Sequence, residues 1–334
     1  MNIEKKVYII IPVYNTEAFL EKCLNSVFKQ TYKNIFVICV NDGSKDNSLM
    51  ILEKYKKYSN FMIVNKENGG LSSARNAGLK EIDYTEDSYI TFIDSDDWID
   101  ENYIEKLVFS LDKEESDICC CSYSIVYDGD SNDMIIKDNL EDKTYSLFES
   151  LKLLFSNKLQ SHAQTKLYKS ELWKDTFFDE NVSFMEDQAT TYKVFSKCNK
   201  ISTINYCGYY FFMRKGSLCR SEMKNKKILD AAFAYIQNFE FNYEALTKEE
   251  QEEIHTLNLQ QFGNVFLMLY PRFNKKKATE TELIDWKKVV SFEKEHKAVR
   301  KFKPINGKQK LKKICFICLK PFYKFIFRTF MKVS

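Results

Sequence analysis

Three carboxylates stand together directly after an apolar and aromatic run. Asp94, Asp96 and Asp97 follow residues 88–93, whose sequence is Ser-Tyr-Ile-Thr-Phe-Ile. Clustered carboxylates repel one another, so we expect a cation among them. An Asp-x-Asp pair can bind a hard divalent cation through oxygen, and such a cation can neutralise a diphosphate. The alternative is that Asp97 or Asp100 caps the next helix, which accounts for one acid but not for three.

The elements that must position these acids are four apolar runs, each predicted to be a β-strand. The runs are residues 7–11, 34–40, 61–64 and 88–93. Each is followed by a predicted helical stretch of roughly 10–14 residues, which is the pattern of βα units that build a parallel sheet. Ligands of open α/β sheets bind beyond the carboxyl ends of the strands. The polar residues after these runs are therefore candidates for one binding site.

Each run ends in a polar motif. In chain order the motifs are Pro12-Val-Tyr-Asn15 with Glu17 beyond it, Asn41-Asp-Gly-Ser44, Asn68-Gly-Gly70 with Ala74-Arg-Asn76, and the acids at 94–97. This set resembles the inverting glycosyltransferases of family 2, of the type that builds bacterial surface polysaccharides. The resemblance spans about residues 5–215. It implies an α/β fold of the GT-A type, with a Rossmann-like, mostly parallel central sheet flanked by helices, and here a C-terminal helical extension.

The resemblance also implies which residues bind the donor, a nucleotide sugar and specifically a UDP-sugar. Val13 and Tyr14 would line the base pocket, and Asp42 would accept from the uracil ring N–H. Asn68 and Arg75 would close that pocket, Asp94 would hold the ribose, and Asp96 would hold Mn²⁺ or Mg²⁺, with Asp94 as a second metal candidate. The complete set of candidate donor-binding residues is Pro12, Val13, Tyr14, Glu17, Asp42, Asn68, Arg75, Asp94, Ser95, Arg214 and Ser217.

Arg214 and Ser217 belong to the segment Arg-Lys-Gly-Ser, which follows a strand-like run at residues 206–213. The segment resembles the flexible loop that closes over the donor diphosphate in related enzymes. Arginine suits phosphate because its guanidinium offers paired N–H donors. The alternative is a solvated turn.

Sugar transfer also needs a base, because the acceptor hydroxyl must lose its proton as the anomeric bond breaks. Glu186 and Asp187 are predicted to lie in the first turn of a helix that runs to about Ser196. Acids at that place can also simply complement the helix dipole. By the resemblance, Asp187 would be the base and Glu186 a supporting or acceptor-orienting group. The segment at residues 162–168 would line the acceptor cleft.

Length and composition agree with a mid-sized enzyme. The 334 residues suffice for an α/β domain with a helical extension, and the hydrophobic content of 44% excludes disorder. No uncharged apolar run reaches about 18 residues, so no transmembrane helix is predicted. The first residues lead directly into the first strand, which leaves no room for a signal peptide and predicts a cytosolic chain. We expect a catalytic domain at 1–220, a helical extension at 221–300 and a basic amphipathic helix at 301–334.

The end of the chain is strongly basic. Twelve Lys and Arg residues and no acidic residue follow Glu295, whereas residues 1–295 carry 38 basic and 47 acidic side chains, a net charge of −9. Large apolar residues are interleaved with these cations. A helix with one cationic and one apolar side can lie in the interface of an anionic membrane, here the inner face of the plasma membrane. The alternatives are a helix packed on the protein and a nucleic-acid-binding arm.

The resemblance, taken with these observations, implies a metal-assisted, inverting hexosyltransferase that acts on a glycan or lipid-linked glycan acceptor, with no role for nucleic acid. One competing hypothesis is a nucleotidyltransferase, but Pro12-Val-Tyr-Asn15 lacks the Gly-rich phosphate loop that such an enzyme normally has after its first strand. The other is a non-catalytic, membrane-associated protein that binds sugar nucleotides. Retention of every acid in the motifs argues against it.

Overall fold

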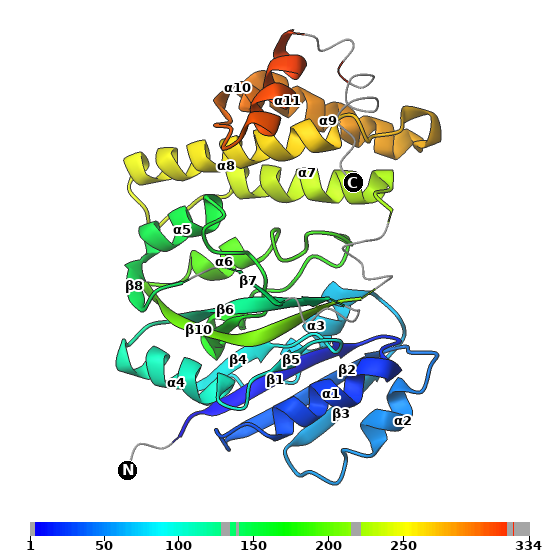
Figure 1. Ribbon diagram of the computed structural model, residues 1–334, viewed down its shortest axis with the longest axis vertical. Helices are drawn as coiled ribbons and strands as arrows, with labels where there is room; N and C mark the ends of the chain where they lie inside the picture. Colours follow the sequence, from blue (N-terminus) through cyan, green and yellow to red (C-terminus); the bar gives the residue numbers. More distant parts are fainter. Residues whose placement is uncertain (1–3, 128–133, 138–139, 215–221, 319–322, 324–334) are drawn as a thin grey trace. The chain divides into compact units, whose positions relative to one another are not determined.

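The computed structural model describes the whole chain except residues 1–3, 128–133, 138–139, 215–221, 319–322 and 324–334 (Figure 1). The chain divides into two compact units. The first unit comprises residues 1–151, 159–181 and 190–220. The second comprises residues 152–158, 182–189 and 221–334, so it includes two short segments from the middle of the chain.

The first unit is built on a sheet that has ten strands among the described residues, in the order β3-β2-β1-β4-β9-β6-β10-β5, with β7 beside β6 and β8 beside β10. Strands β1 to β4 are mutually parallel, as βα units require. Strand β9 runs antiparallel to β4 and β6, and β10 runs parallel to β6. The strands are β1 (Lys6–Val13), β2 (Ile35–Asp42), β3 (Phe61–Lys66), β4 (Ser88–Phe92), β5 (Trp98–Ile99), β6 (Ile118–Tyr127), β7 (Met134–Lys137), β8 (Lys143–Ser146), β9 (Lys166–Lys169) and β10 (Lys200–Met213).

Helices cover both faces of the parallel strands because alternate side chains of a strand point to opposite faces. Ile9 and Ile11 of β1 join a core with Leu24 of α1 and Leu107 of α4. Ile10 faces α3, where a Cβ on Gly78 would lie 2.6 Å from the Ile10 Cγ2 atom. The helices up to residue 200 are α1 (Glu17–Phe28), α2 (Ser48–Glu53), α3 (Leu71–Lys80), α4 (Tyr103–Lys113), α5 (Leu147–Phe155), η1 (Ser170–Trp173) and α6 (Thr191–Phe195).

The four predicted strands are confirmed as β1 to β4, and the predicted α/β class is confirmed with them. Two helix predictions are wrong. Helix α2 has only six residues, because the chain turns after Glu53. The helix predicted to contain Glu186 and Asp187 begins only at Thr191, and residues 186–190 form turns. Met185 has a φ of 63°, a left-handed conformation that a right-handed helix excludes.

The second unit is helical in its described part from residue 225 onward. Helices α8 and α9 each begin with a capping box, formed by Thr247 with Glu250 and by Thr279 with Glu282. Helices α7 and α8 both lie within residues 221–300, where the sequence predicts a helical extension. The elements are α7 (Asn225–Glu240), α8 (Lys248–Leu269), η3 (Lys275–Lys277), α9 (Glu280–His296), α10 (Ala298–Lys301) and α11 (Gly307–Cys318).

The described part of the basic tail packs on this second unit. The ring of Phe316 in α11 contacts the rings of Phe266 and Tyr270 of the unit's core, and buried Tyr323 donates its hydroxyl to the Leu267 carbonyl at 2.9 Å. This agrees with the packed-helix alternative for that part. The basic positions 320, 324, 328 and 332 lie outside the described residues. Within the described chain, the helices lack the length and apolar content needed to cross a membrane.

Candidate active site

The polar motifs after β1, β2 and β4 contact one another at the carboxyl-terminal edge of the parallel strands. The Asn15 N–H donates to the Ser44 hydroxyl at 3.2 Å, and that hydroxyl lies 3.4 Å from the Val13 carbonyl oxygen. The Thr16 hydroxyl donates to buried Ser95 at 3.0 Å. The fold therefore brings together residues that are up to 79 positions apart in sequence, as the sheet topology predicts.

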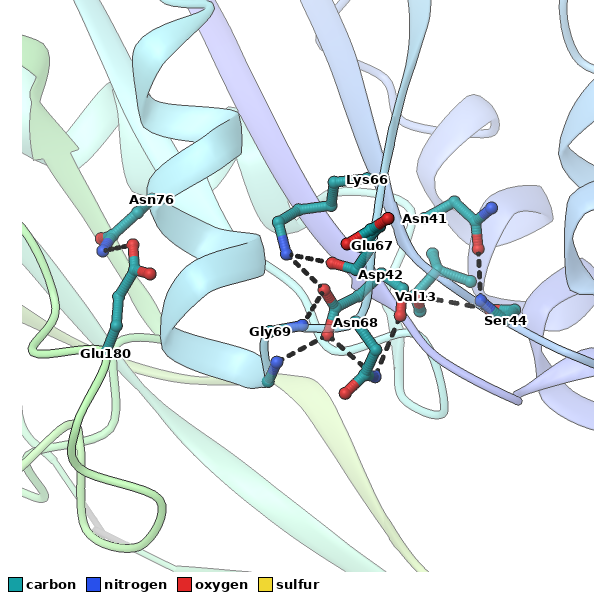
Figure 2. A network of polar contacts seen from close by, with 11 residues as sticks. Val13, Asn41, Asp42, Ser44, Lys66, Glu67, Asn68, Gly69, Asn76 and Glu180 are labelled. Atoms are coloured by element: carbon teal, nitrogen blue, oxygen red, sulfur yellow. Dashed lines mark hydrogen bonds and ion pairs between the residues drawn. The ribbon is translucent and has the colours of Figure 1, made fainter.

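Asp42, the last residue of β2, organises the loop in front of α3 (Figure 2). Its carboxylate accepts from Lys66 Nζ at 2.7 Å, from the Gly69 N–H at 2.9 Å and from the Gly70 N–H at 2.8 Å. The Asn68 side-chain amide donates to it at 3.2 Å. Asp42 is 2% exposed, so these four donors compensate a buried charge. Lys66 belongs to none of the motifs identified from the sequence.

These contacts bear on the predicted contact between Asp42 and uracil. A carboxylate offers about four acceptor positions, and Asp42 already receives four N–H groups from its own chain. An incoming base N–H must therefore displace one of them. The next residue, Gly43, is required by the close approach of this loop: its φ is 69°, and a Cβ there would lie 2.8 Å from the Asn68 nitrogen.

Asp94 is fixed through both of its carboxylate oxygens. Arg75, which is fully buried on α3, donates to Oδ1 at 3.1 Å, and the Gln164 side-chain amide donates to Oδ2. The Asp94 backbone N–H donates to the Tyr209 hydroxyl of β10 at 3.1 Å. Gln164 lies in the segment predicted to line the acceptor cleft, but no sequence motif pairs it with Asp94. Its Oε1 atom is buried with no hydrogen-bond partner.

Asp96 is paired with Arg214, the residue that follows β10. Arg214 Nε donates to Asp96 Oδ2 at 2.7 Å, and the guanidinium also lies over the ring of Phe19, 5.4 Å from its centroid. The structure thus brings together the predicted metal ligand and the predicted diphosphate-binding arginine. Ser217, the other residue predicted in that loop, lies outside the described residues.

Asp97 is held by hydrogen bonds from two residues of β10. It is 3% exposed, and its carboxylate accepts from the Tyr209 hydroxyl at 2.8 Å and from the Phe212 N–H at 2.8 Å. Burial and the nearby charges of Asp94 and Asp96 raise its pKa. Asp97 therefore joins the carboxylate loop to β10 and does not cap α4. Asp100 does not cap α4 either, because the N-cap of that helix is Asn102; Asp100 accepts from the Asn102 backbone N–H at 3.0 Å, just ahead of the helix.

The remaining candidates fall into two groups. Pro12 and Val13 end β1, Tyr14 is 45% exposed beside them, and Glu17 accepts from the Asn47 N–H at 2.8 Å. Glu186 and Asp187 belong to the second unit, where both are partly buried in a turn. The predicted roles of all these residues stay predictions.

The residues around Asp96 fit a divalent cation whose remaining ligands come from the substrate and from water. In the described chain, no group of three or more His, Cys, Asp or Glu side chains could hold a metal ion by itself. Both oxygens of Asp94 accept from protein donors. Mg²⁺ is usually bound by one or two carboxylates and completes its shell with water and substrate phosphates. Asp96 supplies a partly exposed carboxylate of that kind, with a side chain that is 22% exposed.

Comparison with known proteins agrees with this geometry. The model of the family "Glycosyl transferase family 2" matches residues 8–179. The putative glycosyltransferase EpsH of Bacillus subtilis is 31% identical over 259 residues, which are 75% of this chain and 73% of EpsH. The glycosyltransferase GlyA of Streptococcus pneumoniae is 36% identical over 230 residues, which are 66% of this chain and only 32% of GlyA.

The fold is also that of a solved structure. The crystal structure of residues 1–349 of Staphylococcus aureus TarS in complex with UDP-GlcNAc superposes with a TM-score of 0.67 at 22% identity, and the match covers 89% of this chain and 82% of that one. The chain therefore belongs to glycosyl transferase family 2, which confirms the predicted family, the glycosyltransferase class and the GT-A fold.

Proposed function

We propose that this chain transfers a sugar from a UDP-sugar to a hydroxyl of a glycan or lipid-linked glycan, with inversion at the anomeric carbon. The observation that carries the proposal is the arrangement at the end of β4 in a family 2 chain, where Asp94 is held by Arg75 and Gln164 two residues before Asp96. TarS supports the choice of nucleotide, since it was crystallised with UDP-GlcNAc and is named a poly(ribitol-phosphate) β-N-acetylglucosaminyltransferase.

In the proposed reaction the acceptor oxygen attacks the anomeric carbon while the bond from that carbon to the diphosphate breaks. The electron pair of the broken bond stays on UDP, and the Asp187 carboxylate takes the proton of the acceptor hydroxyl. Arg214 binds the leaving diphosphate through its paired N–H donors. The role of Asp187 rests on the family resemblance alone, as does that of Glu186 in orienting the acceptor.

The donor base would sit between Tyr14 and the Asp42 loop, with the uracil N–H replacing one of the present donors to Asp42. Asp94, already oriented by Arg75, would accept from the ribose hydroxyls. Asp96 would hold Mn²⁺ or Mg²⁺, which when bound supplies positive charge against the leaving diphosphate. We further propose that the enzyme works at the cytoplasmic face of the membrane, where a lipid-linked acceptor is found, and that its basic C-terminal region attaches it there.

The test is a panel of nucleotide sugars, with and without Mn²⁺, scored by thermal stabilisation of the purified chain and by release of UDP. A ligand that binds only the folded state stabilises it by RT ln(1 + [L]/Kd) and so raises the melting temperature. We expect UDP-sugars, UDP-GlcNAc among them, to stabilise the protein more than GDP-, CDP- or ADP-sugars, and a chelator to reverse much of the effect. Stabilisation by no uridine nucleotide would overturn the proposal.

A further inference from the structure

Helix α11 of the second unit exposes a row of aliphatic side chains. Leu311, Ile314 and Ile317 follow one another at three-residue spacing and are 53%, 48% and 40% exposed. Residues at this spacing are neighbours on the surface of a helix. Side chains of this kind gain free energy when they leave water, so a contiguous exposed row marks a surface that binds something apolar.

The same helix buries a lysine. Lys312 is 7% exposed, and burial, together with the charges of Lys308 and Arg272, lowers its pKa. The helix is held in this orientation by Phe316, whose ring meets that of Phe266 at a centroid distance of 5.7 Å. The aliphatic row thus faces outward, whereas the inward side of the helix carries an ammonium group. A helix that only packs on its own protein would favour the opposite arrangement, with the aliphatic side chains buried and the lysine in water.

A pocket of about 390 Å³ adjoins this row. Ile317, the last residue of the row, is part of its lining. So are three exposed cations, Lys294, Lys297 and Arg300, from the end of α9 through α10. The single acid in the lining, Glu293, is buried. The pocket therefore offers excess positive charge directly beside an apolar surface.

We infer that this surface docks on a bilayer that contains anionic phospholipid. Lys294, Lys297 and Arg300 would bind the headgroup phosphate, and the aliphatic row would enter the acyl boundary. The absence of acidic residues after Glu295 makes this end of the sequence complementary to a negative surface. A nucleic acid could use the cations, but it would leave the aliphatic row in water. The inference rests on the proposed membrane association and assigns it to residues other than the extreme C-terminus.

The experiment is flotation of the full-length protein with vesicles that contain roughly one third phosphatidylglycerol, compared with pure phosphatidylcholine vesicles. The wild type should bind the anionic vesicles. Ile314→Ser with Ile317→Ser should weaken binding about tenfold at any salt concentration. Lys294→Gln with Arg300→Gln should weaken it about thirtyfold at low salt and flatten its salt dependence, because screening acts on charges and not on apolar contacts.

Matched controls lie on the same unit. Ile284→Ser on α9 removes an aliphatic residue that is 49% exposed, and Lys276→Gln with Lys277→Gln removes two exposed charges far along the chain from the pocket. Both should bind vesicles within about twofold of the wild type. Circular dichroism melts check that every variant is folded.

A second measurement does not depend on the row variants. Cys318, exposed at the end of α11, can carry an environment-sensitive fluorophore in a variant with Cys207 and Cys219 replaced by serine. Its emission should shift to the blue when anionic vesicles are added, since the label would enter the interface. An unshifted emission from vesicle-bound protein would overturn the inference.

Four other results would also overturn it. In the first, the wild type does not float with anionic vesicles, and in the second the control variants bind as weakly as the Ile314/Ile317 variant. In the third, the protein is a dimer that Ile314→Ser dissociates. In the fourth, the Ile314/Ile317 variant binds normally, but binding is lost after Lys320, Lys324 and Arg328 are changed to Gln. UDP release with a soluble acceptor is measured on the same proteins. A wild type that floats but releases no UDP contradicts only the proposed function. A wild type that releases UDP but does not float contradicts only the inferred membrane-binding surface.

Discussion

Arg214 and Asp96 form an ion pair in which Nε of the guanidinium lies 2.7 Å from Oδ2 of the carboxylate. The pair joins the end of β10 to the loop after β4, and its side chains are 26% and 22% exposed. A guanidinium in this position neutralises the carboxylate that is predicted to bind the metal. A divalent cation bound as proposed would therefore compete with the arginine for one anion, and metal binding would depend on where Arg214 lies.

Replacing Arg214 with alanine should strengthen Mn²⁺ binding in the absence of nucleotide and yet reduce turnover. Removal of a competing cation from a partly exposed carboxylate should raise Mn²⁺ affinity about fivefold, since such a pair contributes up to about 1 kcal/mol. Turnover should fall because the diphosphate loses a donor. Mn²⁺ titration by electron paramagnetic resonance measures the first effect. Lys45→Ala, which removes one charge from the loop after β2, is the control, and equal Mn²⁺ affinity in the two variants contradicts the competition.

Asp96→Asn should abolish most activity without unfolding the protein. The amide keeps the shape of the side chain but loses the charged oxygen that a divalent cation requires. We expect transfer to fall by orders of magnitude and the Mn²⁺-dependent part of UDP binding to disappear, as followed by UDP release and calorimetric titration. Normal activity in this variant, or full wild-type activity in excess chelator, is incompatible with the metal assignment.

Asp187→Asn should lower turnover and leave the affinity for the donor nucleotide unchanged. The amide cannot accept the proton of the acceptor hydroxyl, so kcat should drop about 10²–10⁴-fold while the UDP dissociation constant stays nearly unchanged. Glu186→Gln, next to it in the same turn, should have a smaller effect that is expressed mainly in the acceptor KM. If Asp187→Asn binds UDP tenfold more weakly but turns over normally, Asp187 belongs to the donor site.

Gln164 should act as a positioning residue for Asp94. Gln164→Leu removes the N–H donor to Asp94 Oδ2 and should weaken UDP binding about tenfold, because a carboxylate released from one partner samples more orientations. Gln164→Glu should be worse, since it places a second carboxylate against the first. A purely structural role would lower the melting temperature of both variants and leave the UDP dissociation constants of the folded proteins alike.

The sequence predicts the frame of this site well because its determinants are local. Each apolar run forms a strand, and parallel pairing then places the motif after it at one edge of the sheet. The partners that hold the acids are a different matter. Gln164 lies 70 residues from Asp94, and Tyr209 lies 112 residues from Asp97. These pairings follow from the antiparallel placement of β9 between β4 and β6 and from the length of β10. No local sequence pattern predicts either feature.

The incorrect predictions have local physical causes as well. The stretch around Glu186 has apolar and acidic residues at helical spacing, but the left-handed backbone of Met185 prevents a helix there. In α11 the pattern of lysines and aliphatic residues predicts the lysines in water. Aromatic packing of Phe316 overrides the pattern, so that Lys312 is buried and Ile314 is exposed.

The last prediction concerns how the first unit depends on pH, through a buried carboxylate next to β6. Asp117 accepts from Lys169 Nζ at 2.8 Å and from the backbone N–H groups of Asn199 and Lys200 at 2.7 and 3.2 Å. Burial opposes its ionisation, but the hydrogen bonds from Lys169, Asn199 and Lys200 outweigh burial and lower its pKa. A carboxylate with a depressed folded-state pKa stabilises the fold above its unfolded pKa of about 3.9, and this stabilisation is lost as the pH falls through the folded value.

Asp117→Asn should therefore cost roughly 2–3 kcal/mol of unfolding free energy at pH 7, because three donors lose their charged acceptor. The difference from the wild type should narrow as the pH falls below about 4, where the carboxyl of the unfolded chain takes up a proton, and should be lost as the pH passes the lower folded-state pKa. Denaturant melts at a series of pH values measure both. Asp87→Asn, at a carboxylate whose side chain is 68% exposed, should change stability by less than about 0.5 kcal/mol throughout. A difference between Asp117→Asn and the wild type that stays constant or widens toward low pH would show that the charge of Asp117 does not stabilise the sheet.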